Sequence, residues 1–159
     1  MPTPDLAETI KAESALIERF VALLHEEQEA LSSGNIGELP TLSQKKESFA
    51  TELNALSRLR NEQLTALGLA EGRAGMDAWR AANPEKKAIV GAWDKTLSLA
   101  AEARELNRVN GELIRLRMEH NSKALDILVR SRDSLALYGP DGLSTSPEKD
   151  GDRRINDAV

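Results

Sequence analysis

Hydrophobic residues recur at three- and four-residue steps along most of this chain, which is the spacing of an amphipathic helix. The spacing predicts long helices at about residues 4–32, 40–67 and 85–137, and a short helix at 76–82. The C-terminal helix would be about 75 Å long at ~1.5 Å per residue. We therefore expect an all-α fold: an elongated antiparallel three-helix bundle, or coiled-coil hairpin, with one long C-terminal helix and a short connecting helix.

The expected helix ends rest on capping residues and on residues that break helices. Thr3 is a candidate N-cap with Pro4 at the first helical position. Pro40 lies near the start of the second long helix, where a proline is tolerated. Asn83-Pro84-Glu85 combines a cap, a proline and an acid, so it predicts the start of the third. The glycine-rich stretch Gly68–Gly75 between them is interpreted as a linker.

Composition limits what the core and the ends of the chain can be. Hydrophobic residues are 40% of the chain and aromatic residues only 3%, so the core must consist of Leu, Ile and Ala. The few large side chains are Phe20, Phe49, Trp79 and Trp93. The last stretch is polar and rich in Ser, Pro, Lys and Asp, so we expect a helical domain over 1–138 and a flexible tail over 139–159.

Charge and targeting features exclude several classes of protein. The net charge of −5 argues against non-specific binding to nucleic acid and to anionic membrane surfaces. The chain has no cysteine, which excludes disulfide and thiolate chemistry. Its start lacks the pattern of a secretory signal, and no apolar run approaches the ~18 residues that cross a bilayer. We therefore expect a cytoplasmic protein without membrane insertion.

Candidate catalytic residues are few. His25 opens His25-Glu26-Glu27-Gln28-Glu29, but Glu29 stands where a zincin helix has its second histidine. A solvated charged face is the better interpretation of this segment. No pair of carboxylates stands out as an acid/base couple. The sequence thus predicts no metal site, no cofactor and no enzymatic activity.

His120 is the second histidine of the chain and a further candidate catalytic residue. The segment His120-Asn121-Ser122-Lys123-Ala124 resembles the phosphorylated segment of histidine phosphotransfer domains, which are also small helical bundles. Those domains usually have Gly four residues after the histidine, where this chain has Ala124. A helical wheel also aligns His120 with apolar residues. We predict a partly buried, hydrogen-bonded His120, and keep phosphotransfer through His120 as the alternative function.

The long C-terminal helix has more apolar surface than one packing partner covers. Over residues 106–129, apolar groups border an arc of about 220°, against about 100° for an ordinary amphipathic helix. Between the two apolar edges lies a polar seam: Asn107, Asn110, Arg117 and Asn121. One apolar edge can pack on the hairpin of the first two helices. The other edge has no obvious packing partner within the chain, so it is the predicted interaction site. A homodimer, or the segment around Trp79, is the alternative cover for that second edge.

One segment of the long helix carries a family resemblance. Leu106-Asn107-Arg108-Val109-Asn110-Gly111-Glu112-Leu113-Ile114 resembles the Leu-Asn-x-x-Asn-Gly-x-Leu-Ile signature of FlgN-type flagellar export chaperones. The resemblance continues through Asn121, Ala124-Leu125 and Leu128 to Tyr138-Gly139-x-x-Gly142. Upstream it includes Leu24-x-x-Glu27, so that it covers nearly the whole chain.

The resemblance implies a cytoplasmic chaperone of the flagellar type III secretion system. Its partners would be hook–filament junction (hook-associated) proteins, whose C-terminal segments it holds to prevent premature assembly. It would then deliver these clients to the flagellar export apparatus. The resemblance also implies that it uses no nucleotide itself, because the export apparatus supplies the ATPase.

We predict that the client docks as a helix in a groove on the C-terminal half of the long helix. The candidate client-binding residues are Leu106, Asn107, Val109, Asn110, Gly111, Leu113, Ile114, Arg117, Asn121, Leu125 and Leu128. A glycine inside a helix costs up to ~1 kcal/mol. Gly111 is therefore either a point of close approach or a tolerated defect. A self-associating structural coiled coil is the third interpretation of the chain.

Overall fold

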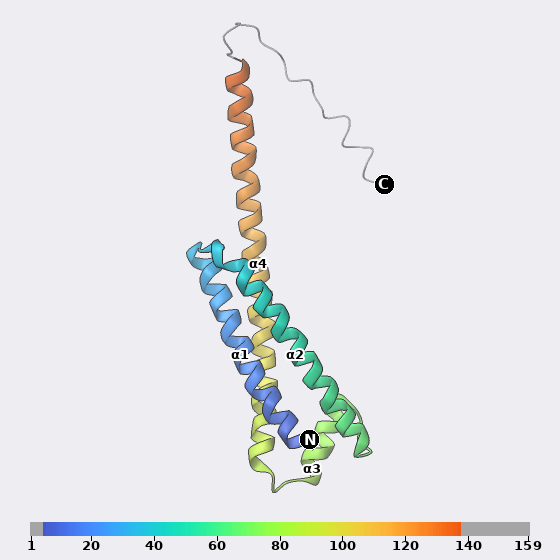
Figure 1. Ribbon diagram of the computed structural model, residues 1–159. Helices are drawn as coiled ribbons and strands as arrows, with labels where there is room; N and C mark the ends of the chain where they lie inside the picture. The colour runs from blue at the N-terminus through green and yellow to red at the C-terminus, as the bar shows by residue number, and fades with distance from the viewer. Residues whose placement is uncertain (1–4, 138–159) are drawn as a thin grey trace, which may run out of the picture. The chain divides into compact units, whose positions relative to one another are not determined.

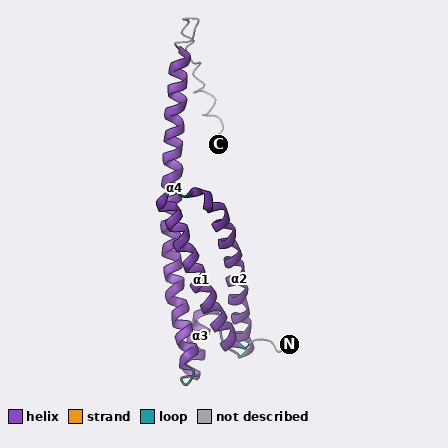
Figure 2. Cartoon of the chain, turned by 60° about the vertical axis from the view of Figure 1, so that its left-hand side comes forward, coloured by secondary structure: helices purple, strands orange, loops and turns teal. Residues whose placement is uncertain are grey.

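The computed structural model describes residues 5–137, and describes side chains up to residue 130. Within residues 5–137 the chain is helical and contains no strand (Figures 1 and 2). The elements in chain order are α1 (Leu6–Ser33), the 3-10 turn η1 (Ile36–Glu38), α2 (Leu39–Ala66), α3 (Gly72–Ala82) and α4 (Lys87–Leu137). The predicted all-α class, with a long C-terminal helix and a short connecting helix, is confirmed. The expected tail at 139–159 lies outside the described residues.

The chain divides into two units, Met1–Ile114 and Arg115–Val159. The first unit holds α1, α2, α3 and the first part of α4, and we call it the bundle. Residues 115–130 of α4 belong to the second unit, and we call them the distal segment.

α1 begins at Leu6, because Asp5 caps it. The Oδ1 atom of Asp5 accepts a hydrogen bond from the backbone N–H of Glu8 at 2.8 Å. The Oε2 atom of Glu8 accepts one from the N–H of Asp5 at 3.3 Å, which completes a capping box. The prediction of Thr3 as the cap and Pro4 as the first helical residue was wrong. Asp5 and Glu8 bond to each other's backbone N–H groups, so the helix is capped at Asp5. Thr3 and Pro4 themselves lie outside the described residues.

The glycine-rich stretch after α2 is an ordered helix end. Gly68 has a φ of 77°, a left-handed conformation that glycine adopts without strain. Its N–H donates to the carbonyl of Thr65, and the N–H of Leu69 donates to that of Leu64, both at 2.9 Å. These two bonds form a Schellman motif, which satisfies carbonyls that the helix end leaves unpaired.

α3 begins at Gly72, four residues before the expected start at Met76. The side-chain oxygen of Asn61, on α2, accepts the N–H of Gly72 at 3.0 Å. Gly75 is buried, and a Cβ added there would lie 1.7 Å from the backbone oxygen of Ala70. The glycines therefore let α3 fold tightly back on the end of α2, a role that the linker interpretation missed.

α4 begins at Lys87 and not at Glu85. Asn83 ends α3: its side-chain N–H₂ group donates to the carbonyl of Trp79 at 2.8 Å. The carbonyl of Asn83 accepts the N–H of Lys86 at 3.1 Å, so the residues between them form a turn. The predicted helix start at Asn83-Pro84-Glu85 was wrong, because the asparagine is used by the preceding helix.

α1 and α2 form an antiparallel hairpin (Figure 1). Glu13, early in α1, pairs with Arg60, late in α2. Glu27, late in α1, pairs with Lys46, early in α2, at 3.2 Å. The order of contacts thus reverses between the two helices, as the sequence predicts for a hairpin.

α4 runs parallel to α1 within the bundle. Lys95 pairs with Glu18 at 3.0 Å, and His25 lies 3.0 Å from Glu102. Both helices therefore advance in the same direction, and only α2 is antiparallel to α4. α2 returns the chain to the end at which α1 began, and α3 joins α2 to α4 at that same end.

The core of the bundle consists of three apolar clusters. The cluster at the α3 end contains both tryptophans, as expected from their size: Leu6, Ile10, Leu64, Met76, Trp79, Ile89 and Trp93. The middle cluster joins α1 to α4: Ile17, Val21, Leu24, Ala103 and Leu106. The third lies between the hairpin helices: Leu23, Ala30 and Leu42, with Leu39 and Phe49 packed against them.

A buried ion pair lies between α1 and α2. An oxygen of the Glu13 carboxylate accepts a hydrogen bond from the Arg60 guanidinium, and both side chains are buried. Ser57 accepts a second hydrogen bond from Arg60 at 3.3 Å. The guanidinium also lies 4.7 Å from the ring centroid of Trp93, which brings α4 into the same layer. A buried charge of this kind is tolerated only when it is paired.

The close approach at Gly75 generates the first prediction. Gly75→Ala should destabilise the fold by about 1–3 kcal/mol, because the new methyl group meets backbone that has no room to move. Gly91→Ala is the matched control, since nothing lies within 4 Å of its Cβ position. It should stabilise α4 by about 0.5–1 kcal/mol. Urea unfolding followed by circular dichroism measures both, and equal effects of the two substitutions would contradict the packing.

The buried pair generates the second prediction. Glu13→Ala should cost about 3–5 kcal/mol, because it leaves the Arg60 charge buried without its carboxylate. Glu18→Ala, on the same helix, removes an exposed pair with Lys95 and should cost less than about 1 kcal/mol. Replacing both Glu13 and Arg60 by Met should recover most of the lost free energy of unfolding. A double variant as unstable as Glu13→Ala would show that the unpaired charge of Arg60 is not the cause of the lost stability.

Candidate functional site

The distal segment exposes an unusual number of large apolar side chains. Six of its residues have between 51% and 67% of their surface exposed: Leu116, Met118, Leu125, Ile127, Leu128 and Val129. Exposed apolar residues are ordinary when they are scattered singly, but a contiguous set marks an interaction site. The distal segment is therefore the leading candidate site among the described residues.

Local sequence explains why this segment is a helix. It contains neither Gly nor Pro, and it carries two ion pairs at the i, i+4 spacing. Arg115 pairs with Glu119 at 2.6 Å, and Asp126 pairs with Arg130 at 3.3 Å. Each pair stabilises an isolated helix by about 0.2–0.5 kcal/mol. That is little support, because helices of about this length are marginal in water without packing.

The six apolar residues share one side of the helix. At ~100° per residue, they fall within an arc of about 220°. The opposite side holds both ion pairs. A helix from a partner that lies along the apolar side would cover part of this arc and leave the ion pairs in water.

The structure places the predicted site residues of the bundle in different surroundings. Leu106 is buried in the middle core cluster, and Asn110 is fully buried. Val109 and Leu113 are half-buried, and Asn107 and Gly111 are exposed. Ile114, at the end of this unit, is 39% exposed. Leu106 and Asn110 are thus interior residues of the bundle and offer a partner no surface.

Asn110 is held by a hydrogen-bond network inside the bundle. Its side-chain N–H₂ group donates to the carbonyl of Leu24 at 3.0 Å and to the Glu27 carboxylate at 2.9 Å. Lys46, on α2, donates to the same carboxylate oxygen at 3.2 Å. The expectation that Asn110 meets a partner's polar groups is therefore corrected: its amide nitrogen joins α4 to α1 and, through Glu27, to α2.

The remaining predicted residues lie in the distal segment. Asn121, Leu125 and Leu128 are exposed, and Arg117 is half-buried. The site prediction omitted Leu116, Met118, Ile127 and Val129, which are equally exposed. The helical wheel could have identified these four residues, because it places them on the two apolar edges. The family signature drew attention to neighbouring positions instead.

Gly111 has no close neighbour in the bundle. Nothing lies within 4 Å of the position that its Cβ would occupy, and α4 continues through it without a break. Packing within the described residues therefore does not require a glycine at this position. The two interpretations that remain are a tolerated defect and an approach point for a partner.

His120 is exposed, which corrects the prediction of a partly buried side chain. The wheel aligned it with apolar residues that are buried or half-buried inside the bundle, but His120 lies in the distal segment, where Leu116 on the same side is also exposed, so the alignment does not bury it. Exposure meets one requirement of a phosphotransfer histidine. Ala124 still stands where that motif has glycine.

Charged residues near the signature are paired on the surface of α4. The Arg108 guanidinium donates two hydrogen bonds to the Glu105 carboxylate, at 2.7 and 3.1 Å. This hydrogen bonding lowers the pKa of Glu105 and raises the pKa of Arg108. Both groups are fully exposed, so the pair belongs to a solvated face.

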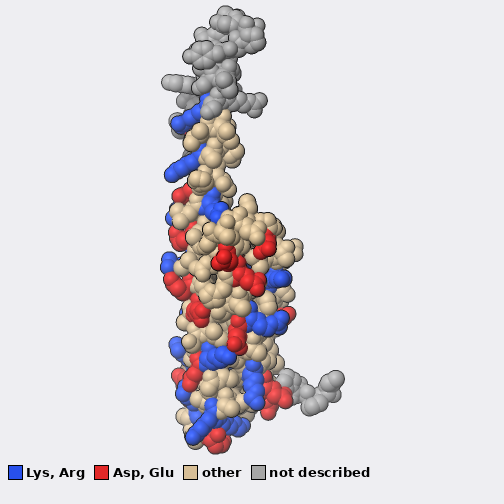
Figure 3. Space-filling model, turned by 90° about the vertical axis from the view of Figure 1, so that its left-hand side faces the viewer, with Lys and Arg blue, Asp and Glu red and all other residues tan. Residues whose placement is uncertain are grey.

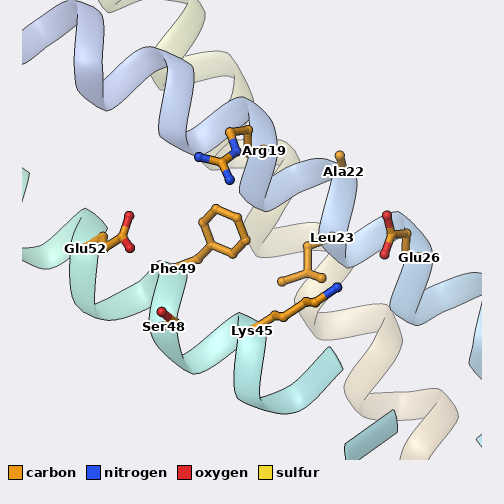
Figure 4. Close-up of a pocket in the computed structure, with 8 residues that line it drawn as sticks. All are labelled: Arg19, Ala22, Leu23, Glu26, Lys45, Ser48, Phe49 and Glu52. Carbon is orange, nitrogen blue, oxygen red and sulfur yellow. The ribbon is translucent and has the colours of Figure 1, made fainter. Parts of the chain in front are cut away.

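Two shallow grooves run along the bundle, each of about 490 Å³. One lies between α1 and α2, where Arg19 stands 5.1 Å from the ring centroid of Phe49 and Lys45 reaches toward Glu26 (Figure 4). Its walls carry both signs of charge, so they select no particular charge. The other is lined by residues of α1, α2 and α4, including Asn107, which is the one predicted site residue in either groove.

No metal site or membrane-spanning helix stands out among the described residues. They contain no group of three or more His, Cys, Asp or Glu side chains placed to hold a metal ion. None of the helices, as far as they are described, is both long and apolar enough to cross a bilayer.

Comparison with known proteins adds a family. The model of the family described as FlgN protein matches residues 1–146. The chain is 32% identical over 127 residues to the flagella synthesis protein FlgN of Yersinia enterocolitica, covering 80% of each chain. It is 27% identical over 153 residues to the protein of the same name from Salmonella typhimurium strain LT2, covering 95% of this chain and 97% of that protein. No solved structure gives a significant match.

The position of Asn110 generates the third prediction. Asn110→Ala should cost about 1–3 kcal/mol, because it removes buried hydrogen bonds to Leu24 and Glu27. Asn107→Ala, one turn away and exposed, should change the free energy of unfolding by less than about 0.5 kcal/mol. Thermal unfolding compares the two variants. Equal stability of both would mean that the network contributes nothing to the bundle.

Proposed function

The chain belongs to the FlgN family, and from this premise we propose that it is a cytoplasmic export chaperone for hook–filament junction proteins. It binds their C-terminal segments, prevents premature assembly, and delivers them to the flagellar type III export apparatus. The single observation that supports this most directly is the exposed apolar side of the distal segment. The names of the relatives, flagella synthesis proteins, support the flagellar setting.

The mode of binding that we propose is helix against helix. A junction protein that has not yet assembled leaves the apolar side of its C-terminal segment without a partner. The distal segment presents the complementary surface, with large side chains at helical spacing. Each covers apolar residues of the other, which reduces the surface open to non-specific association.

The expected strength suits a carrier that must release its client. Burying a large apolar side chain stabilises by about 1.5–3 kcal/mol. Association itself costs about 4–15 kcal/mol in lost freedom, so six such residues yield a modest surplus. The binding is therefore reversible, and no covalent step or nucleotide is needed. We accordingly propose a binding protein and not an enzyme.

The fourth prediction tests this surface. Leu125→Asp combined with Leu128→Asp should abolish binding of a junction protein's C-terminal segment, because two carboxylates would enter the apolar interface. Lys11→Asp is the matched control: it changes the net charge by the same amount at an exposed position of α1, outside the distal segment. Co-expression followed by size-exclusion chromatography with light scattering measures the complex and its stoichiometry.

The same experiment separates the alternatives. A stoichiometric complex with the native chain and with Lys11→Asp, lost in the double variant, supports the proposal. Absence of a complex with any late flagellar subunit would overturn it. A dimeric mass without client, lost in the double variant, would instead assign the apolar side to a second copy of the chain.

A further inference from the structure

The distal segment differs in charge from the chain that carries it. The whole chain has a net charge of −5, yet the distal segment holds four cations and two carboxylates. On the face that Figure 3 shows, the part of α4 nearest the grey C-terminal atoms carries Lys and Arg among uncharged side chains. At physiological salt, charges further apart than about 8 Å are largely screened. A partner on this segment therefore responds to its local cations.

The two carboxylates of the segment lie away from the apolar side. Glu119 and Asp126 fall on the opposite side of the helical wheel, and each already pairs with an arginine. The apolar side itself carries one permanent charge among its described residues, Arg117, which is half-buried. Lys123 stands near one edge of that side. The surface that meets a partner is thus apolar and positive, without a carboxylate.

A docked helix would lie against Arg117 and close to Lys123. A positive patch attracts a partner whose facing residues are carboxylates, and arginine and carboxylate form strong charge-assisted hydrogen bonds. A partner with carboxylates there gains attraction to both cations, whereas a partner with lysines meets repulsion. A second copy of this chain would bring the same cations against each other, because a symmetric dimer joins the same patch on both subunits.

We propose that the segment docking on the distal segment is an acidic amphipathic helix, with carboxylates that flank its apolar side and meet Arg117 and Lys123. This inference rests on the proposed function, and it specifies the chemistry by which a client is recognised. The apolar side chains supply most of the affinity, and the charges select the partner and its orientation.

Two designed peptides test the proposal against the full chain. They share the same apolar positions at helical spacing, and they differ only in flanking residues, which are Glu in one and Lys in the other. Fluorescence anisotropy should show the Glu peptide binding at least about tenfold more tightly at low salt, with the difference shrinking as salt is added. Equal affinities, or tighter binding of the Lys peptide, would overturn the proposal.

Charge reversal on the chain gives the complementary measurement. Arg117→Glu and Lys123→Glu, alone and together, should weaken binding of the Glu peptide and strengthen binding of the Lys peptide. Lys11→Glu is the control, since it makes the same change of charge on an exposed position of α1. Circular dichroism confirms that each variant remains helical, and the exposed Lys123 provides a test even if Arg117→Glu perturbs the helix. Unchanged peptide preference in the Lys123 variant would count against the proposal.

A junction protein's C-terminal segment, used as a third probe, distinguishes a failure of the charge selection from a failure of the chaperone function. If it binds the native chain and both charge variants equally, the charge selection is wrong and the chaperone function stands. If it does not bind, while the designed peptides show the predicted preference, the function is wrong and the surface chemistry stands.

Discussion

One buried carboxylate holds the three long helices of the bundle together. Glu27, on α1, accepts hydrogen bonds from Asn110 on α4 and from Lys46 on α2. Apolar side chains could tolerate a shift of one helix along another, since Leu and Ile pack in many arrangements. A buried polar contact does not tolerate such a shift, because the shift would leave its groups without partners in a dry interior. The hydrogen bonds of Glu27 therefore fix which residues of α4 pack inside the bundle.

Periodicity predicted the helices well, because the three- and four-residue spacing extends over dozens of positions. Helix ends were harder, since neighbouring polar residues compete for the same unpaired groups. Asp5 with Glu8 displaced Thr3, and Asn83 served the end of α3 and not the start of α4. The Gly68–Gly75 stretch shows the same limit: a glycine that permits a loop and a glycine that permits close packing look identical in a sequence.

The candidate site was predicted only in part, and the reason is related. A helical wheel gives the angles between side chains, but it does not say which angle faces the other helices. Asn107 and Asn110 lie about 60° apart, and both fitted the seam. Packing on α1 buried Asn110 and left Asn107 exposed. The distal residues needed no such choice, since apolar groups on both edges exceed what one partner covers.

The weak intrinsic stability of the distal segment has a consequence for the lifetime of the protein. A helix whose large apolar residues are exposed opens far more often than one whose apolar residues are buried, and open segments are what proteases cut. A partner lying along it would slow that opening in proportion to its occupancy. An empty molecule would then be degraded sooner than a loaded one. Its abundance would follow the supply of the partner, without any dedicated regulator.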